Sequence, residues 1–331
     1  MGFFAKSVQN APLPGKWVKS SPWNPYALSA FCLGVLLGNS VFAQTNSVDA
    51  EQLFNAMLVN VQSLRTIEAE VRVEVFVMGK EHVAKGKYEE QRLENPPPGD
   101  FQRSMYRLYL YFASETPTTP GSERNSLTVI CHPTSDRDVG RLWKYRSIEG
   151  VKSVQYVNLA KLEDAVRQRG RQSLIGNVGE TKNLGGLSGT LKQIARFYGF
   201  ADSPGETVMD GGESRPVWKI VGTLRSEFEE SMTKAFGGLE KKTNNFPNQM
   251  PTDIEIFIGV DDAFPYKIEY RNRPKADSSK RTVLTRIVYS DVSLNGEPIP
   301  ELKFSAFDKG NLPEGVYQTD DITEQVIRSI R

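Results

Sequence analysis

The chain has 331 residues, of which 39% are hydrophobic, so it is long enough to bury a sizeable core in one large or two modest domains. Its net charge is +1, and a chain without an excess of basic residues is a poor candidate for binding nucleic acid. Composition and charge therefore exclude a disordered chain and give no support to a nucleic-acid partner.

The amino-terminal segment has the pattern of a secretory signal. Three lysines and no acidic residue accompany an apolar run from Ala27 to Leu37, which is followed by small residues at Val41 and Ala43. The run is shorter than the roughly 20 residues that span a bilayer, although an uncleaved anchor would use the same run. We expect residues 1–43 to be a signal peptide cleaved after Ala43. The mature protein would then lie in the periplasm or be otherwise exported to the cell envelope.

The mature chain is predicted to begin with an amphipathic helix and a strand. The helix carries one apolar stripe, formed by Leu53, Phe54, Met57, Leu58, Val61 and Leu64. From Ile67 to Val77 apolar and polar residues then alternate almost without a break, which is typical of a strand with one buried and one solvated side. The buried side covers either a solid core or a cavity for an apolar ligand, and the two alternatives imply different proteins.

Further strands follow, separated by turn residues. The segment VAKGKYEEQRL is polar and is predicted to be an edge or exposed strand. In FQRSMYRLYLYFA, the side chains of Tyr106, Leu108, Leu110 and Phe112 share one face. Three shorter strands are predicted in NSLTVICH, GRLWKYRSI and KSVQYVNL.

Two helical segments interrupt the strands. They are LAKLEDAVRQR and LSGTLKQIARFYGF, and the second carries an apolar stripe of Leu187, Leu191, Ile194, Ala195 and Tyr198. The glycine-rich link between them lacks the Gly-Lys-Ser/Thr ending of a phosphate-binding loop. We therefore interpret this link as a flexible loop or hinge.

The remainder is predicted to contain two hairpins, a last pair of strands and a capped helix. In the second hairpin, TDIEIFIGVDDAFPYKIEYRNR, the residues Ile256 and Ile268 face the same way. Consecutive hairpins without a βαβ rhythm exclude a doubly wound fold. The pattern predicts an α+β fold, in which a curved antiparallel sheet carries helices on one side.

Residues with catalytic or metal-binding chemistry are sparse. The chain has two histidines, His82 and His132, and neither has a second ligand at metal-binding spacing. Cys131 alternates with Leu127 and Val129, so we expect a buried, inert thiol rather than a reactive one. We predict no enzyme, no cofactor and no metal, while a pair of carboxylates far apart in the chain, as in an envelope hydrolase, is left open.

Three segments resemble the LolA/RseB-like superfamily of periplasmic lipoprotein carriers. The first is the exported leader and amphipathic helix followed by LRTIEAEVRVEVFVMG, and the second is DVGRLWKYRSIEGVKSVQYVNLAKLED. The third runs from FPYKIEYRNR to LNGEPIPELKFSAFDKGNLPEGV. The resemblance covers most of residues 47–317, and it implies insertions near residues 90–125 and 200–250.

The resemblance implies a single half-barrel domain over residues 44–331. Its curved sheet would be closed on the concave side by amphipathic helices, which enclose a hydrophobic cavity for acyl chains. The residues expected to line this cavity are Val71, Val73, Val75, Leu108, Leu110, Val129, Trp143, Ile256 and Ile268. The helix expected to act as a lid carries Leu187, Leu191, Ile194 and Tyr198.

The sequence favours an exported, non-enzymatic protein that holds lipid acyl chains or an acylated lipoprotein. Such a protein would carry its ligand across the periplasm and contact the membrane transiently. The alternative is an envelope protein-interaction or sensor domain on the same fold, with a protein partner and without a bound lipid.

Overall fold

The structure of the protein is a computed structural model. It describes residues 49–77, 79–94, 104–112, 125–132, 140–148, 150–169, 186–201, 204–209, 214–229, 251–272, 282–300, 316 and 319–329. These residues belong to one compact unit. The predicted signal peptide at 1–43 and the glycine-rich link between the two helical segments lie outside the described residues.

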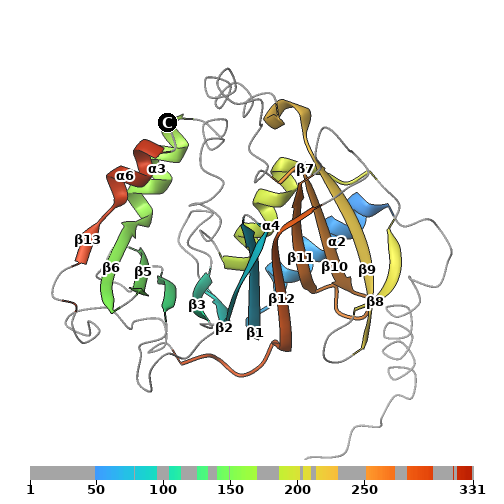
Figure 1. Ribbon diagram of the computed structural model, residues 1–331, viewed down its shortest axis with the longest axis horizontal. Coiled ribbons are helices and arrows are strands. Elements are labelled where there is room, and N and C mark those ends of the chain that lie inside the picture. The colour runs from blue at the N-terminus through green and yellow to red at the C-terminus, as the bar shows by residue number, and fades with distance from the viewer. Residues whose placement is uncertain are drawn as a thin grey trace, which may run out of the picture. The chain divides into compact units, whose positions relative to one another are not determined.

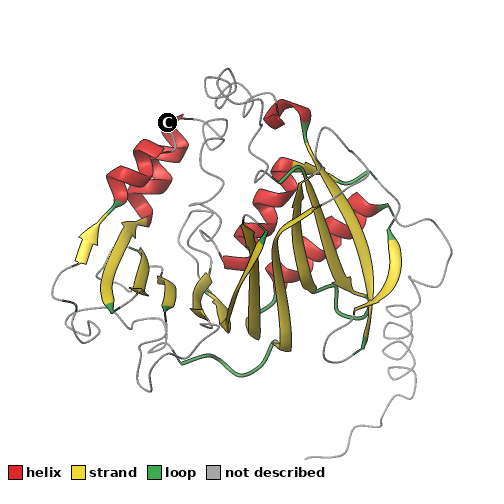
Figure 2. Cartoon of the chain, viewed as in Figure 1, coloured by secondary structure: helices red, strands yellow, loops and turns green. Residues whose placement is uncertain are grey.

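Thirteen strands of the described residues form one sheet (Figures 1 and 2). The order is β13-β6-β5-β4-β3-β2-β1-β12-β11-β10-β9-β7, and β8 pairs with β9. The first half of the sheet consists of β1 (Thr66–Val77), β2 (Lys80–Arg92), β3 (Ser104–Phe112), β4 (Ser126–His132), β5 (Arg141–Ile148) and β6 (Val151–Asn158). The rest are β7 (Tyr198–Gly199), β8 (Gly205–Met209), β9 (Arg215–Leu224), β10 (Asp253–Gly259), β11 (Pro265–Asn272), β12 (Thr282–Leu294) and β13 (Thr319–Asp321).

The pairing is that of two antiparallel meanders. One runs from β1 to β6 and the other from β9 to β12, and the pairing of β1 with β12 joins them. β13 adds to β6 as a short parallel strand. Because consecutive strands are antiparallel neighbours, no crossover connection is needed within either meander, and only two residues separate β1 from β2 and β5 from β6.

The alternation along β1 defines two faces of the sheet. Ile67, Ala69 and Val71 are buried, whereas Glu70 is half-buried and Arg72 is exposed. We call the face that carries Ile67 the inner face and the opposite one the outer face. Directly paired residues of neighbouring strands project from the same face, so the pairing extends these two names across the whole sheet.

Helices pack on the inner face and bury its apolar side chains. They are α2 (Ala50–Ser63), α3 (Leu159–Arg169), α4 (Gly186–Phe197) and α6 (Thr323–Ser329). α2 lies against α4 and β9, α4 also lies against β3, and α3 and α6 lie against each other and against β6. The predicted α+β fold, a curved antiparallel sheet with amphipathic helices on one side, is therefore confirmed. Within the described residues, no helix is both long enough and apolar enough to span a bilayer.

The segment predicted to be an edge or exposed strand is a central strand. β2 lies between β1 and β3, and its residues Ala84, Tyr88 and Glu90 are buried on the inner face. The prediction was wrong because Lys85 and Lys87 project from the outer face and make the segment resemble a solvated strand. Because successive side chains of a strand point to opposite faces, the polarity of each face has to be assessed separately.

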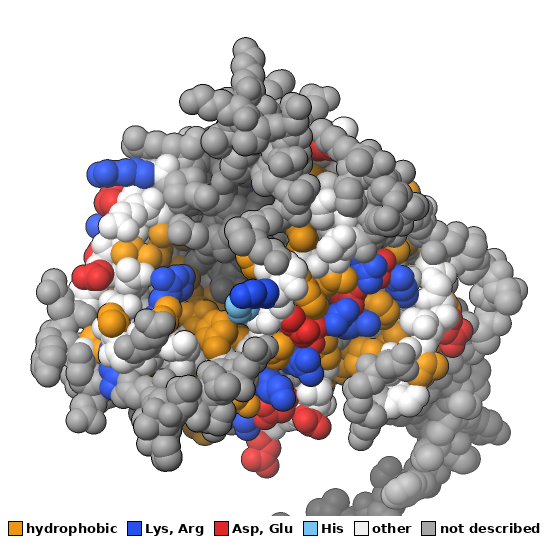
Figure 3. All heavy atoms as spheres, in the orientation of Figure 1, with side chains coloured by type: hydrophobic (Ala, Val, Ile, Leu, Met, Phe, Trp, Pro, Cys, Tyr) orange, Lys and Arg blue, Asp and Glu red, His pale blue; other side chains and the backbone are white. Residues whose placement is uncertain are grey.

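The outer face of β1 and of the second meander carries ion pairs (Figure 3). Arg286 of β12 donates to Glu269 of β11 and to Glu74 of β1, at 2.7 Å each. Lys219 of β9 pairs with Glu255 of β10 at 3.0 Å. The carboxylates are almost fully buried beneath the longer basic side chains. The Arg286 pairs tie β1 to the second meander across the junction of the two, and the Lys219 pair links two strands within the second meander.

Candidate functional site

Strand pairing places most of the predicted lining residues on one continuous surface of β1 to β4. On the inner face, Val71 of β1 lies opposite Gly86 of β2, and Gly86 lies opposite Leu110 of β3. Leu110 in turn lies opposite Leu127 of β4. We call this surface the apolar floor, and its larger side chains are Val71, Val73, Val75, Val77, Leu108, Leu110, Phe112, Leu127 and Val129.

The apolar floor is covered at one end and open at the other. Along β1 the exposed fraction rises from 4% at Val71, through the half-buried Val73 and Val75, to 36% at Val77. Along β3 it is 38% at Phe112, although Leu110 on the same strand and Ala84 opposite it are buried. Solvent therefore reaches Val77 and Phe112 at this end, where the inner-face residues Lys80 and His82 of β2 are exposed as well.

Three of the predicted lining residues lie elsewhere. Ile256 and Ile268 face each other on the inner face of β10 and β11, where both are fully buried in the main core. Trp143 of β5 lies on the outer face and packs against Tyr156, with the ring centroids 5.0 Å apart. It belongs to a separate apolar cluster that includes Ile299. The structure therefore brings together the predicted residues of β1, β3 and β4, and it does not bring those of β5, β10 and β11 to the floor.

The helix predicted as a lid is α4, and it is packed into the main core. Leu187 and Ile194 are 2% exposed and Leu191 is fully buried. The helix ends at Phe197, so Tyr198 is not on it and instead begins the short strand β7. Apolar contacts thus hold α4 along its whole length.

A buried carboxylate on β2 also holds the first turn of α4. Glu90 accepts hydrogen bonds from the Ser104 hydroxyl at 2.5 Å, from the Leu187 N–H at 3.1 Å and from the Tyr88 hydroxyl. The same N–H of Leu187 donates to the Tyr88 hydroxyl oxygen at 2.7 Å. Burial raises the pKa of Glu90, although each of these hydrogen bonds acts to lower it.

The sequence pattern did not reveal this cluster. Tyr88 and Glu90 occur in a segment rich in charged residues, where a glutamate is normally solvated. The available signal was the period-two relation among Ala84, Tyr88 and Glu90, which places all three on one face. The partner of Glu90 on α4 is about a hundred residues away and could not be inferred from local pattern.

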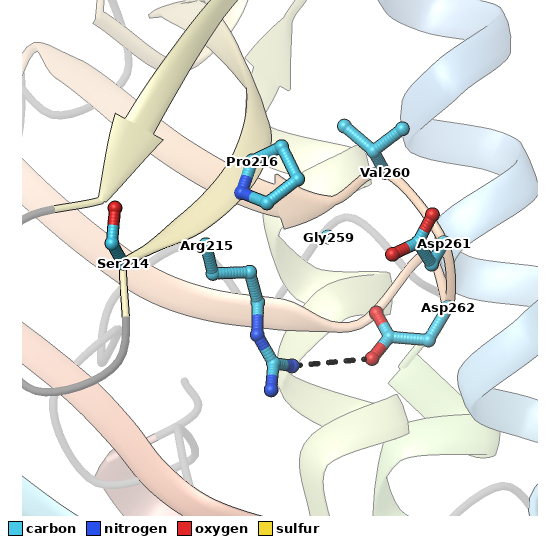
Figure 4. Close-up of a pocket in the computed structure, with 7 residues that line it drawn as sticks. All are labelled: Ser214, Arg215, Pro216, Gly259, Val260, Asp261 and Asp262. Atoms are coloured by element: carbon cyan, nitrogen blue, oxygen red, sulfur yellow. Dashed lines mark hydrogen bonds and ion pairs between the residues drawn. The ribbon is translucent and has the colours of Figure 1, made fainter.

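A polar pocket of about 280 Å³ lies beside the turn between β10 and β11 (Figure 4). Arg215 forms an ion pair with Asp262 at 3.4 Å, and its guanidinium carbon lies 4.1 Å from the centre of the Tyr266 ring. The Tyr266 hydroxyl donates to Asp262 at 2.5 Å, and Asn60 of α2 donates to the Asp262 carbonyl at 2.6 Å. These contacts fix the turn against α2 and leave the Asp262 carboxylate with partners inside the protein.

Of the described groups with nucleophilic or metal-binding chemistry, one lies at the open end of the floor, because the exposed His82 of β2 is directly paired with Val75. Cys131 is fully buried, and burial raises the pKa of its thiol, in agreement with the predicted inert cysteine. His82 is exposed on β2 and His132 ends β4. Within the described ranges, no three His, Cys, Asp or Glu side chains are placed to hold a metal ion. The floor offers apolar contact area to a ligand.

Comparison with known proteins finds similarity among solved structures. No protein-family model matches the chain, and no curated protein matches its sequence. A DUF1329 family protein from Desulfovibrio piger is 10% identical with a TM-score of 0.34, and the match covers 77% of this chain and 97% of that one. A putative outer membrane lipoprotein-sorting protein domain from Vibrio parahaemolyticus is 7% identical with a TM-score of 0.30, over 77% and 95% of the two chains. MucB, in a complex with MucA(peri), is 14% identical with a TM-score of 0.32, over 75% of this chain and 57% of MucB.

Proposed function

We propose that the protein is an exported, non-enzymatic binding protein that holds lipid acyl chains, or the acyl chains of a lipoprotein, against the apolar floor. The observation that carries the proposal is the rise in exposure along β1, where solvent reaches aliphatic side chains of an otherwise buried face. Large exposed apolar patches on soluble proteins commonly mark interaction sites, and in this proposal Val77 and Phe112 belong to such a site. The signal pattern in residues 1–43 supports a location in the cell envelope.

On the second meander, by contrast, the helices cover the inner face. There Ile220, Ile256 and Ile268 are fully buried under the helices and leave no room for a ligand. The open end of the floor lies on the first meander, beyond the region where α4 contacts the sheet. A hydrocarbon chain would complete the floor in the way that α2 and α4 complete the second meander.

Binding an acyl chain requires only an apolar surface on the protein and no catalytic groups. Moving one methylene from water to an apolar site gains about 0.8 kcal/mol. A chain that leaves a membrane gives up a similar amount, so its net transfer is close to neutral. The protein needs an apolar surface comparable to a bilayer, with an entrance, and the exposed Val77 and Phe112 supply an entrance to the floor.

Fluorescence titration with cis-parinaric acid, a fatty acid whose emission rises in apolar surroundings, tests the proposal. Phe112→Glu introduces a charge at the open end of the floor, and we expect it to weaken probe binding at least tenfold, because a buried Phe contributes about 1.5–3 kcal/mol. Native mass spectrometry of the purified protein should in addition detect bound acyl chains.

Tyr109→Glu is the matched control for this substitution. Tyr109 lies on the same strand with almost the same exposure, 36% against 38% for Phe112, but it projects from the outer face. We expect this variant to bind the probe as the wild type does. If the wild-type protein binds no probe and carries no lipid, the proposal is contradicted. That result would favour the alternative of an interaction or sensor domain without lipid.

A further inference from the structure

A hairpin tip beside the open end of the apolar floor carries two exposed aliphatic side chains. The tip joins β5 to β6, and Ile148 and Val151 on either side of it are directly paired. Ile148 is 48% exposed, and Val151 is 72% exposed, the highest value among the large apolar side chains that the structure describes. Nothing lies within 4 Å of the position that a Cβ of Gly150 would occupy, so the turn projects into open space.

Strand register places this tip next to Phe112. Ser126 of β4 is directly paired with Tyr111 of β3 and with Ser147 of β5. Phe112 and Ile148 are the next residues in the same direction along β3 and β5, and two strand spacings, about 10 Å, separate them. Both project from the inner face, because Tyr111 and Ser147 project from the outer face. Exposed apolar side chains therefore continue from the open end of the floor as far as β6.

Basic side chains lie among these apolar ones. We call Val77, Phe112, Ile148 and Val151 together the apolar rim. Lys80 is directly paired with Val77, and Arg146 lies two residues before Ile148, so both project from the inner face, and both are exposed. The core of a protein–protein interface is usually depleted of charged residues. At a membrane surface, in contrast, long basic side chains reach the head groups while apolar neighbours enter the acyl boundary. The composition of the rim therefore fits a lipid bilayer better than a partner protein.

We propose that the apolar rim docks on the surface of a lipid bilayer, so that an acyl chain passes from the membrane to the floor without crossing water. This inference rests on the proposed function, since it takes the floor as the site that receives the chain. A chain that crossed water would lose the favourable burial of every methylene group before it regained that burial on the protein. Docking shortens this path, because Val77 and Phe112 belong both to the rim and to the floor.

Flotation of the mature chain, residues 44–331, with vesicles tests the docking. The vesicles contain equal parts of phosphatidylcholine and phosphatidylglycerol. We expect the wild type to float with them, and Ile148→Ser combined with Val151→Ser to bind at least about tenfold more weakly, because two aliphatic side chains no longer enter the bilayer. Added salt should weaken wild-type binding without abolishing it, since salt screens the basic side chains and leaves apolar contacts in place.

Val59→Ser combined with Val208→Ser is the matched control. Val59 of α2 is 66% exposed and Val208 of β8 is 54% exposed, so this pair resembles the rim pair in exposure. Neither residue belongs to the first meander, because β8 pairs with β9 and α2 is a helix. We expect the control to float as the wild type does. Urea unfolding of both double variants verifies that each is folded.

The rate at which cis-parinaric acid moves from the loaded protein to vesicles tests the transfer itself. If the rim docks, transfer occurs during contact, and the wild-type rate should rise with vesicle concentration. In the variant at residues 148 and 151, the probe has to leave through water, so its rate should become independent of vesicle concentration. This variant should still bind the probe from solution as the wild type does, because the floor residues are unchanged.

The outcomes separate this inference from the proposed function. A wild type that binds the probe but does not float overturns the docking and leaves the proposed function in place. The same holds if the variant at residues 148 and 151 floats as the wild type does. A wild-type dimer that this variant abolishes, without flotation, would make the rim an interface between copies of the chain and would also overturn the docking. A wild type that floats but binds no probe supports the docking and overturns the proposed function.

Discussion

Gly186 cannot be replaced by a residue with a side chain without strain, for two reasons. Its backbone has φ +65°, and a Cβ atom there would lie 2.6 Å from a carboxylate oxygen of Glu90. The left-handed backbone costs a residue with a side chain about 1–2 kcal/mol, and overpacking of a buried site adds about 1–3 kcal/mol. We expect Gly186→Ala to lower the free energy of unfolding by about 3 kcal/mol, measured by urea denaturation.

Gly150 provides the control for this substitution. It has φ +80°, and nothing lies within 4 Å of the position that a Cβ would occupy. Gly150→Ala should therefore show the backbone cost alone, about 1 kcal/mol. Equal losses for the two variants would mean that the contact between residue 186 and Glu90 does not limit the packing of α4.

At the scale of the element, α4 is attached to the sheet through a titrating group. Burial raises the pKa of Glu90 above its ordinary value of 4.5. A carboxyl group with a raised pKa in the folded state contributes stability that is fully present below about pH 4.5 and is lost as the pH rises through the folded pKa. The wild type thus becomes less stable, relative to a variant without this carboxyl group, as the solution is made neutral.

Glu90→Gln keeps an acceptor for Ser104 and the Leu187 N–H but cannot ionise. We expect its free energy of unfolding, relative to that of the wild type, to increase between pH 4.5 and pH 8, measured by urea denaturation at each pH. Glu89→Gln, on the outer face of the same strand, controls for the change in net charge. A difference between Glu90→Gln and wild type that is the same at every pH would contradict the raised pKa.

Sequence pattern was informative for elements with one apolar and one polar side. The alternation in β1 and the spacing of Ile256 and Ile268 across a hairpin identify the strands and their inner faces, because apolar residues recur at every second position along them. Leu142 and Trp143 are consecutive apolar residues, so the pattern could not decide which of them faces the floor. Pairing places Leu142 on the inner face and Trp143 on the outer face.

The parts of the site that could not be predicted depend on long-range pairing. Lys144 and Arg146 lie beside the floor because β5 follows β4 in register, which puts Arg146 opposite Leu127 and Lys144 opposite Val129. In the sequence these two basic residues simply alternate with Trp143 and Tyr145. Neither the register of a strand nor the extent of helix cover over it is encoded in local periodicity.

At the scale of the whole molecule, the two meanders depend on the junction between β1 and β12. Arg286 links Glu74 and Glu269 across β1, β12 and β11, and Glu269 also accepts a hydrogen bond from the Arg271 Nε at 3.0 Å. Burial acts to raise the pKa of Glu269, but the hydrogen bonds from Arg271 and Arg286 outweigh it and lower the pKa. Stability from this group is therefore present above about pH 4.5 and is lost as the pH falls through the folded pKa.

Glu269→Gln should consequently destabilise the protein most at neutral pH. Glu269 is 1% exposed, and removal of one partner of a buried pair costs about 3–5 kcal/mol. Because the two arginines are partly solvated, we expect about 2 kcal/mol at pH 7 by urea denaturation, and a smaller difference from wild type at pH 3.5. Glu81→Gln removes a carboxylate that is 46% exposed and 3.9 Å from Arg72, and should change stability by less than about 0.5 kcal/mol. If Glu269→Gln were as mild as this control, the ion pairs of the outer face would not hold the two meanders together, and backbone pairing between β1 and β12 would have to suffice.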